Sequence, residues 1–208
     1  MSVARFSCRC GAVRGQVSGV APHKVNRVVC YCADCQAYAH QLGRADLLDA
    51  KGGSDIVQIA PAAMSITSGA PNVAGLRLSE KGLPRFYAKC CGTPLGNAPG
   101  AAIPFVGVLA PIFRCEGQEP DALFGKVTGG IKGEYAIGGA PPGTKGISLP
   151  LMLRAVGLVL GWKLAGRGRP HPFFGPDKQP LYPMSVLSKE QRDKLRPLCG
   201  PKSASSSL

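Results

Sequence analysis

Hydrophobic positions along the chain fall mostly into short runs separated by glycine and proline. Ala12 to Val17 roughly alternates between apolar and polar side chains, and Asp55 to Ala60 is another run with strand character. Runs of this length, bounded by turn residues, are typical of strands. With 28 Gly and 19 Pro in 208 residues, the pattern predicts a mainly β core with few long helices.

One later segment breaks this pattern. Residues 147–164 are almost continuously apolar, with Ser148 at the N-cap and Pro150 in the first turn, and they predict a buried helix at about 148–164. Packing on the domain or on a partner is favoured over membrane insertion, because the segment is short for a bilayer span and contains Arg154. An interfacial helix is the alternative, with the anchors Trp162, Lys163, Arg167 and Arg169.

The C-terminal part of the chain contains a second helix signal. Ser188 and Gln191 fit a capping box, which predicts a short helix at about 188–196. We therefore expect one domain over residues 1–125, a basic extension with one or two helices over residues 126–202, and a disordered tail at 203–208.

The chain carries a formal net charge of +13, and most of the excess lies after Lys145. Such a charge attracts nucleic acid, anionic lipid or a small acidic substrate, although a solvated basic face fits equally well. The N-terminal segment lacks an apolar stretch long enough for a secretory signal, so we expect a reducing, cytoplasmic location.

Cysteine spacing carries the strongest chemical signal. Zinc prefers thiolates in tetrahedral geometry, and clustered cysteines in a cytoplasmic protein indicate metal binding rather than disulfides. Four thiolates close the shell of a structural site, whereas three leave a position for water or substrate. Three clusters are present, namely Cys8 and Cys10, then Cys30, Cys32 and Cys35, then Cys90 and Cys91. Their seven cysteines divide naturally into one closed and one open site. The two other cysteines, Cys115 and Cys199, are interpreted as free thiols.

The same motifs resemble those of the glutathione-dependent formaldehyde-activating enzyme (GFA) family, which includes centromere protein V. The resemblance covers roughly residues 5–110, in order and approximate spacing. It implies that residues 1–125 form a GFA-like β-tent domain of small coiled sheets, with one structural and one catalytic zinc. The matching segments are Cys8 to Val13, Cys30 to Cys35 and Cys91 to Leu95.

By this resemblance, Cys8, Cys10 and Cys91 match structural ligands, and Cys30, Cys32 and Cys35 match catalytic ones. The sequence departs from the family at Ala88, where a further structural cysteine is expected. Cys90 is the favoured replacement, and Cys115, a histidine or water is the alternative. A second departure is Gln36, where the family commonly has arginine.

The resemblance implies a carbon–sulfur lyase of the S-(hydroxymethyl)glutathione synthase type, with glutathione as a possible co-substrate. An open zinc site with three thiolates can hold a substrate thiolate beside its electrophile. Asp34 and His40 are candidates for proton transfer or ordinary surface residues, and Tyr31 and Gln36 are candidates for pocket lining or for packing. Candidates for binding a substrate carboxylate are Arg9, Arg44, Arg85 and Lys89.

Two other functions compete with the enzyme. One is a non-catalytic, zinc-stabilised module that binds a protein partner. The other is nucleic-acid binding through the basic extension. A homodimer is a further possibility, and a membrane surface and nucleic acid are less favoured partners than a small thiol or thioether.

Overall fold

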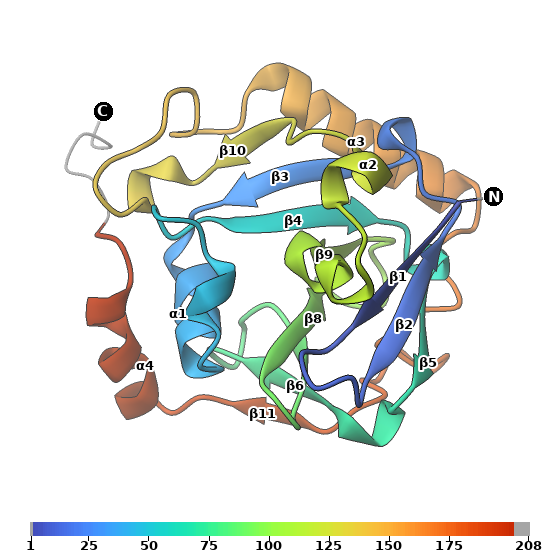
Figure 1. Ribbon diagram of the computed structural model, residues 1–208, viewed down its shortest axis with the longest axis horizontal. Helices are drawn as coiled ribbons and strands as arrows, with labels where there is room; N and C mark the ends of the chain where they lie inside the picture. Colours follow the sequence, from blue (N-terminus) through green and yellow to red (C-terminus); the bar gives the residue numbers. More distant parts are fainter. Residues whose placement is uncertain (1, 202–208) are drawn as a thin grey trace.

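The computed structural model describes residues 2–201 and has the mainly β fold that the sequence predicts (Figure 1). Within these residues the strands form one sheet of three and one of eight, accompanied by four α-helices. The side chain of Cys115 and the predicted disordered tail at 203–208 lie outside the described part.

The smaller sheet is antiparallel, in the order β1-β2-β5. β1 and β2 form the N-terminal hairpin, and Cys8 and Cys10 lie in its turn. Alternating residues of β1 point into the core, with Ala4 and Phe6 fully buried, as expected for a strand with one solvated face. The bounds are β1 Val3–Ser7, β2 Arg14–Ser18 and β5 Met64–Ser68.

The larger sheet has the order β10-β3-β4-β9-β8-β7-β6-β11. Its six inner strands pair antiparallel, and β8 meets β9 at the pair Asn97 and Gly107. Both edge strands come from after residue 125 and pair in parallel, β10 with β3 and β11 with β6. The bounds are β3 Asn26–Cys30, β4 Ser54–Ile59, β6 Val73–Arg77, β7 Arg85–Ala88, β8 Thr93–Asn97, β9 Val106–Leu109, β10 Gly129–Ile131 and β11 Met184–Val186.

The main core contains residues from both sheets and from the C-terminal extension. Phe86 of β7 and Phe173 are fully buried, and their rings stack with centroids 4.1 Å apart. Phe6 and Phe113 meet edge to face at 5.8 Å. Large aromatic side chains contribute much of the buried apolar area in such a core, so the extension helps to hold the sheets together.

Two helices lie where the sequence predicts them, but the first is not the buried helix expected. The apolar helix is α3 and begins after Ser148, and only its Leu151 and Trp162 are buried, because one side packs on the protein and the other is exposed. The capping box of Ser188 and Gln191 opens α4 as predicted. A further helix, α1, begins at Ala33 with Cys32 as its N-cap. No helix in the described residues has the length and apolar content needed to cross a bilayer. The bounds are α1 Ala33–Gln41, α2 Pro120–Phe124, α3 Leu149–Leu164 and α4 Lys189–Leu195.

Candidate metal centres

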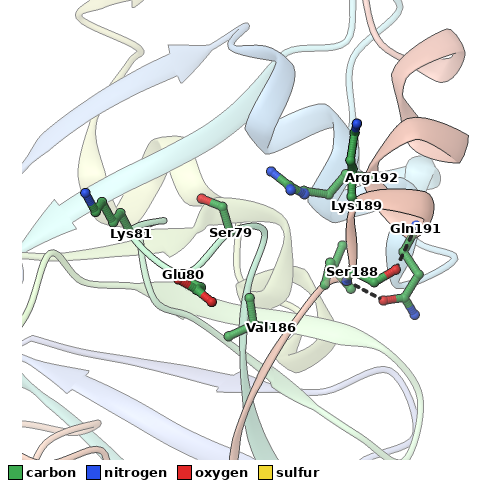
Figure 2. A pocket seen from close by; sticks show the side chains of 9 residues that line it. Ser79, Glu80, Lys81, Val186, Ser188, Lys189, Gln191 and Arg192 are labelled. Carbon is green, nitrogen blue, oxygen red and sulfur yellow. Dashed lines mark hydrogen bonds between the residues drawn. The ribbon is translucent and has the colours of Figure 1, made fainter.

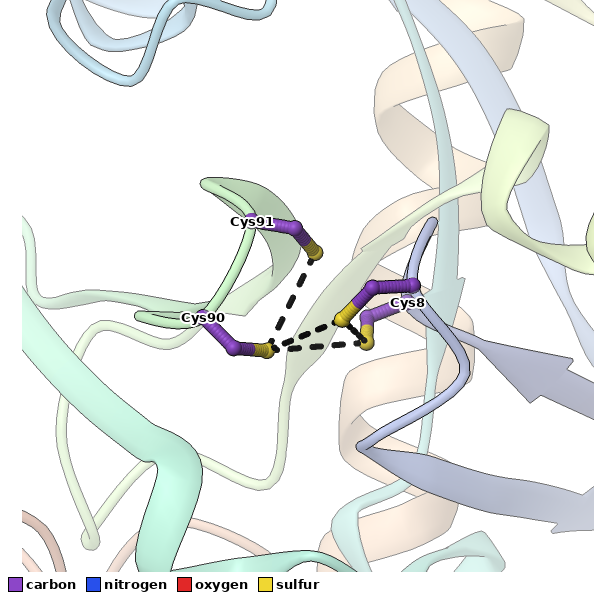
Figure 3. A group of neighbouring side chains, drawn as sticks. Cys8, Cys90 and Cys91 are labelled. Atoms are coloured by element: carbon purple, nitrogen blue, oxygen red, sulfur yellow. Dashed lines mark hydrogen bonds between the residues drawn. The ribbon is translucent and has the colours of Figure 1, made fainter.

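Four thiols from two hairpin turns form the first cysteine group, which consists of Cys8, Cys10, Cys90 and Cys91. Cys8 and Cys10 follow β1, and Cys90 and Cys91 connect β7 to β8. All four Sγ atoms lie within 4.8 Å of one another, and Figure 3 shows Cys8, Cys90 and Cys91 facing a common space. The first group therefore links the smaller sheet to the larger one.

The sulfur spacing in the first group suits a tetrahedral metal. The Sγ atoms of Cys10 and Cys90 are 3.3 Å apart, those of Cys8 and Cys10 3.5 Å, and those of Cys8 and Cys90 3.9 Å. Zinc–sulfur bonds of about 2.3 Å in a tetrahedron place the sulfurs about 3.8 Å apart. The group could hold a metal ion of this size with small adjustments of the side chains.

Hydrogen-bond donors surround the first group. The amide of Val13 donates to Cys8 Sγ at 3.2 Å, and Cys91 Sγ lies 3.1 Å from Thr93 Oγ1. Burial alone would raise the pKa of Cys91, but the Thr93 hydroxyl and nearby backbone amides lower it to about 6. Arg44 Nη1 donates to Thr93 Oγ1 at 2.8 Å, and such partners orient metal ligands.

Three thiols where β3 meets α1 form the second cysteine group, which consists of Cys30, Cys32 and Cys35. Cys30 ends β3, Cys32 is the N-cap of α1, and Cys35 lies in the first helical turn. The amide of Cys35 donates to Cys32 Sγ at 3.4 Å, and the Sγ atoms of Cys30 and Cys35 are 3.9 Å apart. All three sulfurs lie within 4.8 Å of one another, so this group also could hold a metal ion.

The three thiols of the second group differ in the direction of their pKa shifts. Hydrogen bonds with Cys30 and Cys35 lower the pKa of Cys32, and the charge of Arg85 lowers it further. The same interactions with Cys32 raise the pKa of Cys30 and contribute to the raised pKa of Cys35. The arrangement favours a thiolate at Cys32 held by two thiol donors, and binding a metal there would release the remaining protons.

Arg85 is the buried cation beside the second group. Its side chain is 3% exposed, and its Nη2 lies 3.6 Å from Asp34 Oδ2 at the start of α1. The guanidinium lies over the Tyr38 ring, 5.7 Å from the centroid. Its Nε atom is buried and has no hydrogen-bond partner among the described residues. A buried guanidinium of this kind favours anions in its surroundings.

Gln36 fastens the loop of the second group to the extension. Its side chain is fully buried, and its Nε2 donates to Tyr31 O at 2.6 Å and to Tyr135 O at 3.0 Å. Its Oε1 accepts from the Gly200 amide at 2.8 Å. Of the two roles considered for Gln36, the structure gives it the packing role.

The remaining residues proposed for substrate binding or proton transfer do not all lie at the same cysteine group. Arg9, through its amide, and Arg44 both bond Thr93 at the first group, and Lys89 immediately precedes Cys90. These three basic residues, offered as carboxylate ligands for the catalytic triplet, therefore lie at the first group. Asp34 is exposed and His40 is half-buried in the last turn of α1.

Cys199 is a neighbour of α1 that the sequence did not reveal. Its Sγ donates to Ala33 O at 3.4 Å, and it remains a free thiol as expected. Together with Asp34 and Arg196 it lines a hollow of about 130 Å³. Cys199 and Ala33 are 166 positions apart in the chain, which explains why no local motif predicts the contact.

A larger hollow of about 690 Å³ lies between the end of β6 and the start of α4 (Figure 2). Lys81, Lys189 and Arg192 line it together with Glu80 and Ser188. Its lining residues include none of the cysteines of the two groups, so this hollow belongs to neither candidate metal centre.

Fold and site together define a mainly β protein with two cysteine groups able to hold metal ions. The chain belongs to a family of unknown function, DUF6151, whose model matches residues 1–182. No curated protein matches the sequence. A solved structure of a Rhodobacter sphaeroides protein, a structural genomics target, is 19% identical, with a TM-score of 0.41 over 61% of this chain and 98% of that chain.

Proposed function

We propose that this protein binds two zinc ions and that the second group holds the thiol of a small substrate. The reaction class is that of a carbon–sulfur lyase or a glutathione-dependent thiol-adduct enzyme. The observation that carries the proposal is the unequal number of thiols, four in the first group and three in the second. Four thiolates complete a tetrahedral zinc shell, whereas three leave the open position typical of catalytic zinc.

Zinc in the second group would supply a Lewis acid that keeps a substrate thiol deprotonated at neutral pH. In the addition direction, the substrate sulfur forms a bond to a carbonyl carbon and the thiol proton ends on the carbonyl oxygen. In the elimination direction, the carbon–sulfur bond breaks, the carbonyl re-forms and the sulfur regains a proton. Both directions are balanced without an oxidant or reductant.

The residues around the second group have two tasks in this reaction. Arg85 favours negative charge at Cys32, and its buried guanidinium stabilises an anion held at the second group. Gln36 fixes the Tyr31 carbonyl between Cys30 and Cys32. Fixed geometry of this kind preserves the alignment of ligand and substrate.

The test compares two cysteine variants of the zinc-loaded protein. Turnover is measured with glutathione and formaldehyde and with S-hydroxymethyl thiol adducts, and zinc is counted per chain. Cys32→Ser is expected to abolish turnover and to lose one of the two zinc ions. Cys199→Ser removes a neighbouring thiol outside the group and is expected to retain both. Unchanged turnover in Cys32→Ser would contradict the proposal.

A non-catalytic zinc module is the second candidate, and one observation favours it. Cys30 is 7% exposed and packs in an apolar cluster with Val28, Ile56 and Leu151. A metal enclosed in this way would stabilise the junction of β3 and α1 without meeting substrate. In a non-catalytic module of this kind, a protein or nucleic acid would bind the basic extension. Retention on a polyanion column that falls steeply with salt would support nucleic acid as the partner.

A further inference from the structure

The outward face of α3 is an almost purely apolar surface. Leu151 and Trp162 point inward and are buried, whereas the large side chains on the other side of the helix are 44% to 89% exposed. Positions 149, 153, 156, 160 and 164 repeat at intervals of three and four residues, which places them on one helical stripe. The α3 face is defined here as the exposed large apolar side chains of this helix together with Ile147 just before it; it consists of Ile147, Leu149, Met152, Leu153, Val156, Leu160 and Leu164.

Contacts on the inner side fix the direction in which the α3 face points. Arg154 Nη2 donates to Pro22 O at 2.6 Å and to Val25 O at 2.7 Å. Leu151 packs with the residues of β3 and β4 that surround Cys30. Figure 1 shows α3 running along the outside of the larger sheet, next to β3. The helix is therefore held at the surface, and the α3 face is not its packing side.

The size of the α3 face argues against a second copy of this chain as its occupant. Taking about 100 Å² for each fully exposed aliphatic side chain, the face offers roughly 400 Å² of apolar surface. A standard protein interface buries about 800 Å² on each partner. Two copies carrying a net charge of +13 each would also repel one another.

The charges around the α3 face suit an anionic surface. Lys163 is exposed in the last turn of α3, and Arg169 is exposed five residues after the helix ends. The sequence contains no acidic residue between Glu134 and Asp177. An apolar stripe bordered by cations binds at the boundary of headgroups and acyl chains, where apolar burial and attraction to anionic lipid act together.

We propose that the α3 face docks the protein on an anionic lipid surface, with the helix lying in the plane of the membrane. Its inner side stays packed on the protein through Leu151 and Trp162, and its outer leucines enter the acyl boundary. No atom beyond the adjoining residues and the helix backbone lies within 4 Å of the position that a Cβ would take at Gly157 or Gly161, so the helix backbone is open there. The proposal is independent of the chemistry at the second cysteine group.

The experiment is sedimentation of the full-length protein with vesicles. One set is phosphatidylcholine and the other is phosphatidylcholine with phosphatidylglycerol at roughly 7:3. Binding is expected to the anionic vesicles and to fall in high salt. Leu153→Glu combined with Leu160→Glu, at residues 61% and 53% exposed, is expected to weaken binding at least tenfold. Lys163→Glu is expected to weaken it at least fivefold.

Controls separate docking from loss of fold. Val186→Glu combined with Leu198→Glu makes the same charge change at residues 46% and 49% exposed on β11 and after α4, and it should bind as the unmodified protein does. Trp162, the sole tryptophan, should keep a buried emission spectrum in every variant. Equal vesicle binding by the two double variants would overturn the proposal. It would also be overturned if the unmodified protein binds no vesicles and is instead a dimer in light scattering that the Leu153→Glu and Leu160→Glu double variant dissociates.

Discussion

Replacing Gln36 with leucine tests how the extension supports the second cysteine group. The amide of Gln36 satisfies three backbone groups from three segments, namely Tyr31 O, Tyr135 O and the Gly200 amide. Leucine has a similar size and is apolar, so Gln36→Leu removes all three hydrogen bonds without opening a large cavity. Each backbone group left unsatisfied in a buried site costs about 1–3 kcal/mol.

Burying the leucine side chain offsets part of this cost, by about 2 kcal/mol. The free energy of unfolding of Gln36→Leu is therefore expected to fall by about 3 kcal/mol. Zinc affinity of one of the two sites should fall by about tenfold, because Tyr31 lies between Cys30 and Cys32 and loses its outer-shell partner. Urea unfolding measures the first quantity, and competition with a chromophoric chelator measures the second.

The matched control is Gln41→Leu, the same change at an exposed residue of the same helix. A surface change of this kind should alter the free energy of unfolding by no more than about 0.5 kcal/mol. If Gln36→Leu loses no more stability than Gln41→Leu and keeps the zinc affinity, Gln36 does not fasten the loop as described.

Three further changes probe the fold in urea unfolding. Arg27→Met removes the 4% exposed partner of Asp55 at 2.7 Å, so it should cost about 3 kcal/mol, and a loss below 1 kcal/mol would contradict that role. Burial and then the charge of Arg169 lower the pKa of His171 from 6.5 to about 4. The unfolded chain therefore takes up this proton at higher pH, and stability that is full above pH 6.5 should fall by about 2 kcal/mol between pH 7 and pH 5. His171→Asn should lack this fall, and an unchanged pH profile would refute the assignment. Ser188→Ala removes the α4 cap and should cost about 1 kcal/mol, whereas no change would show that α4 forms without it.

The sequence predicted contacts between residues that are close in the chain better than contacts between residues that are far apart in the chain. The Cys30, Cys32 and Cys35 grouping follows from spacing alone, because a strand end and one helical turn bring the three sulfurs together. The proximity of Cys90 to Cys8 and Cys10 needed the resemblance as a guide. The alternation typical of strands likewise located β2 and β4 within about two residues.

The pairing of strands far apart in the chain could not be predicted from the sequence. β10 and β11 are three residues each, too short for a periodicity, and they become strands because they fill the two edges of the larger sheet. The start of α1 carries no ordinary sequence signal, because its N-cap is Cys32 and cysteine is not among the usual capping residues. The burial of Gln36 depends on contacts with residues 99 and 164 positions away.

The two cysteine groups are proposed to differ in their number of sulfur ligands, with a closed zinc site in the first group and an open one in the second. Metal analysis combined with X-ray absorption of the zinc-loaded protein measures this difference. We expect two zinc ions per chain with an average of about 3.5 sulfur ligands, the remainder being a lighter atom. Cys90→Ser should lower the sulfur average while leaving the second group loaded. One zinc per chain, or four sulfurs at both sites, would show that the protein does not have one closed and one open zinc site.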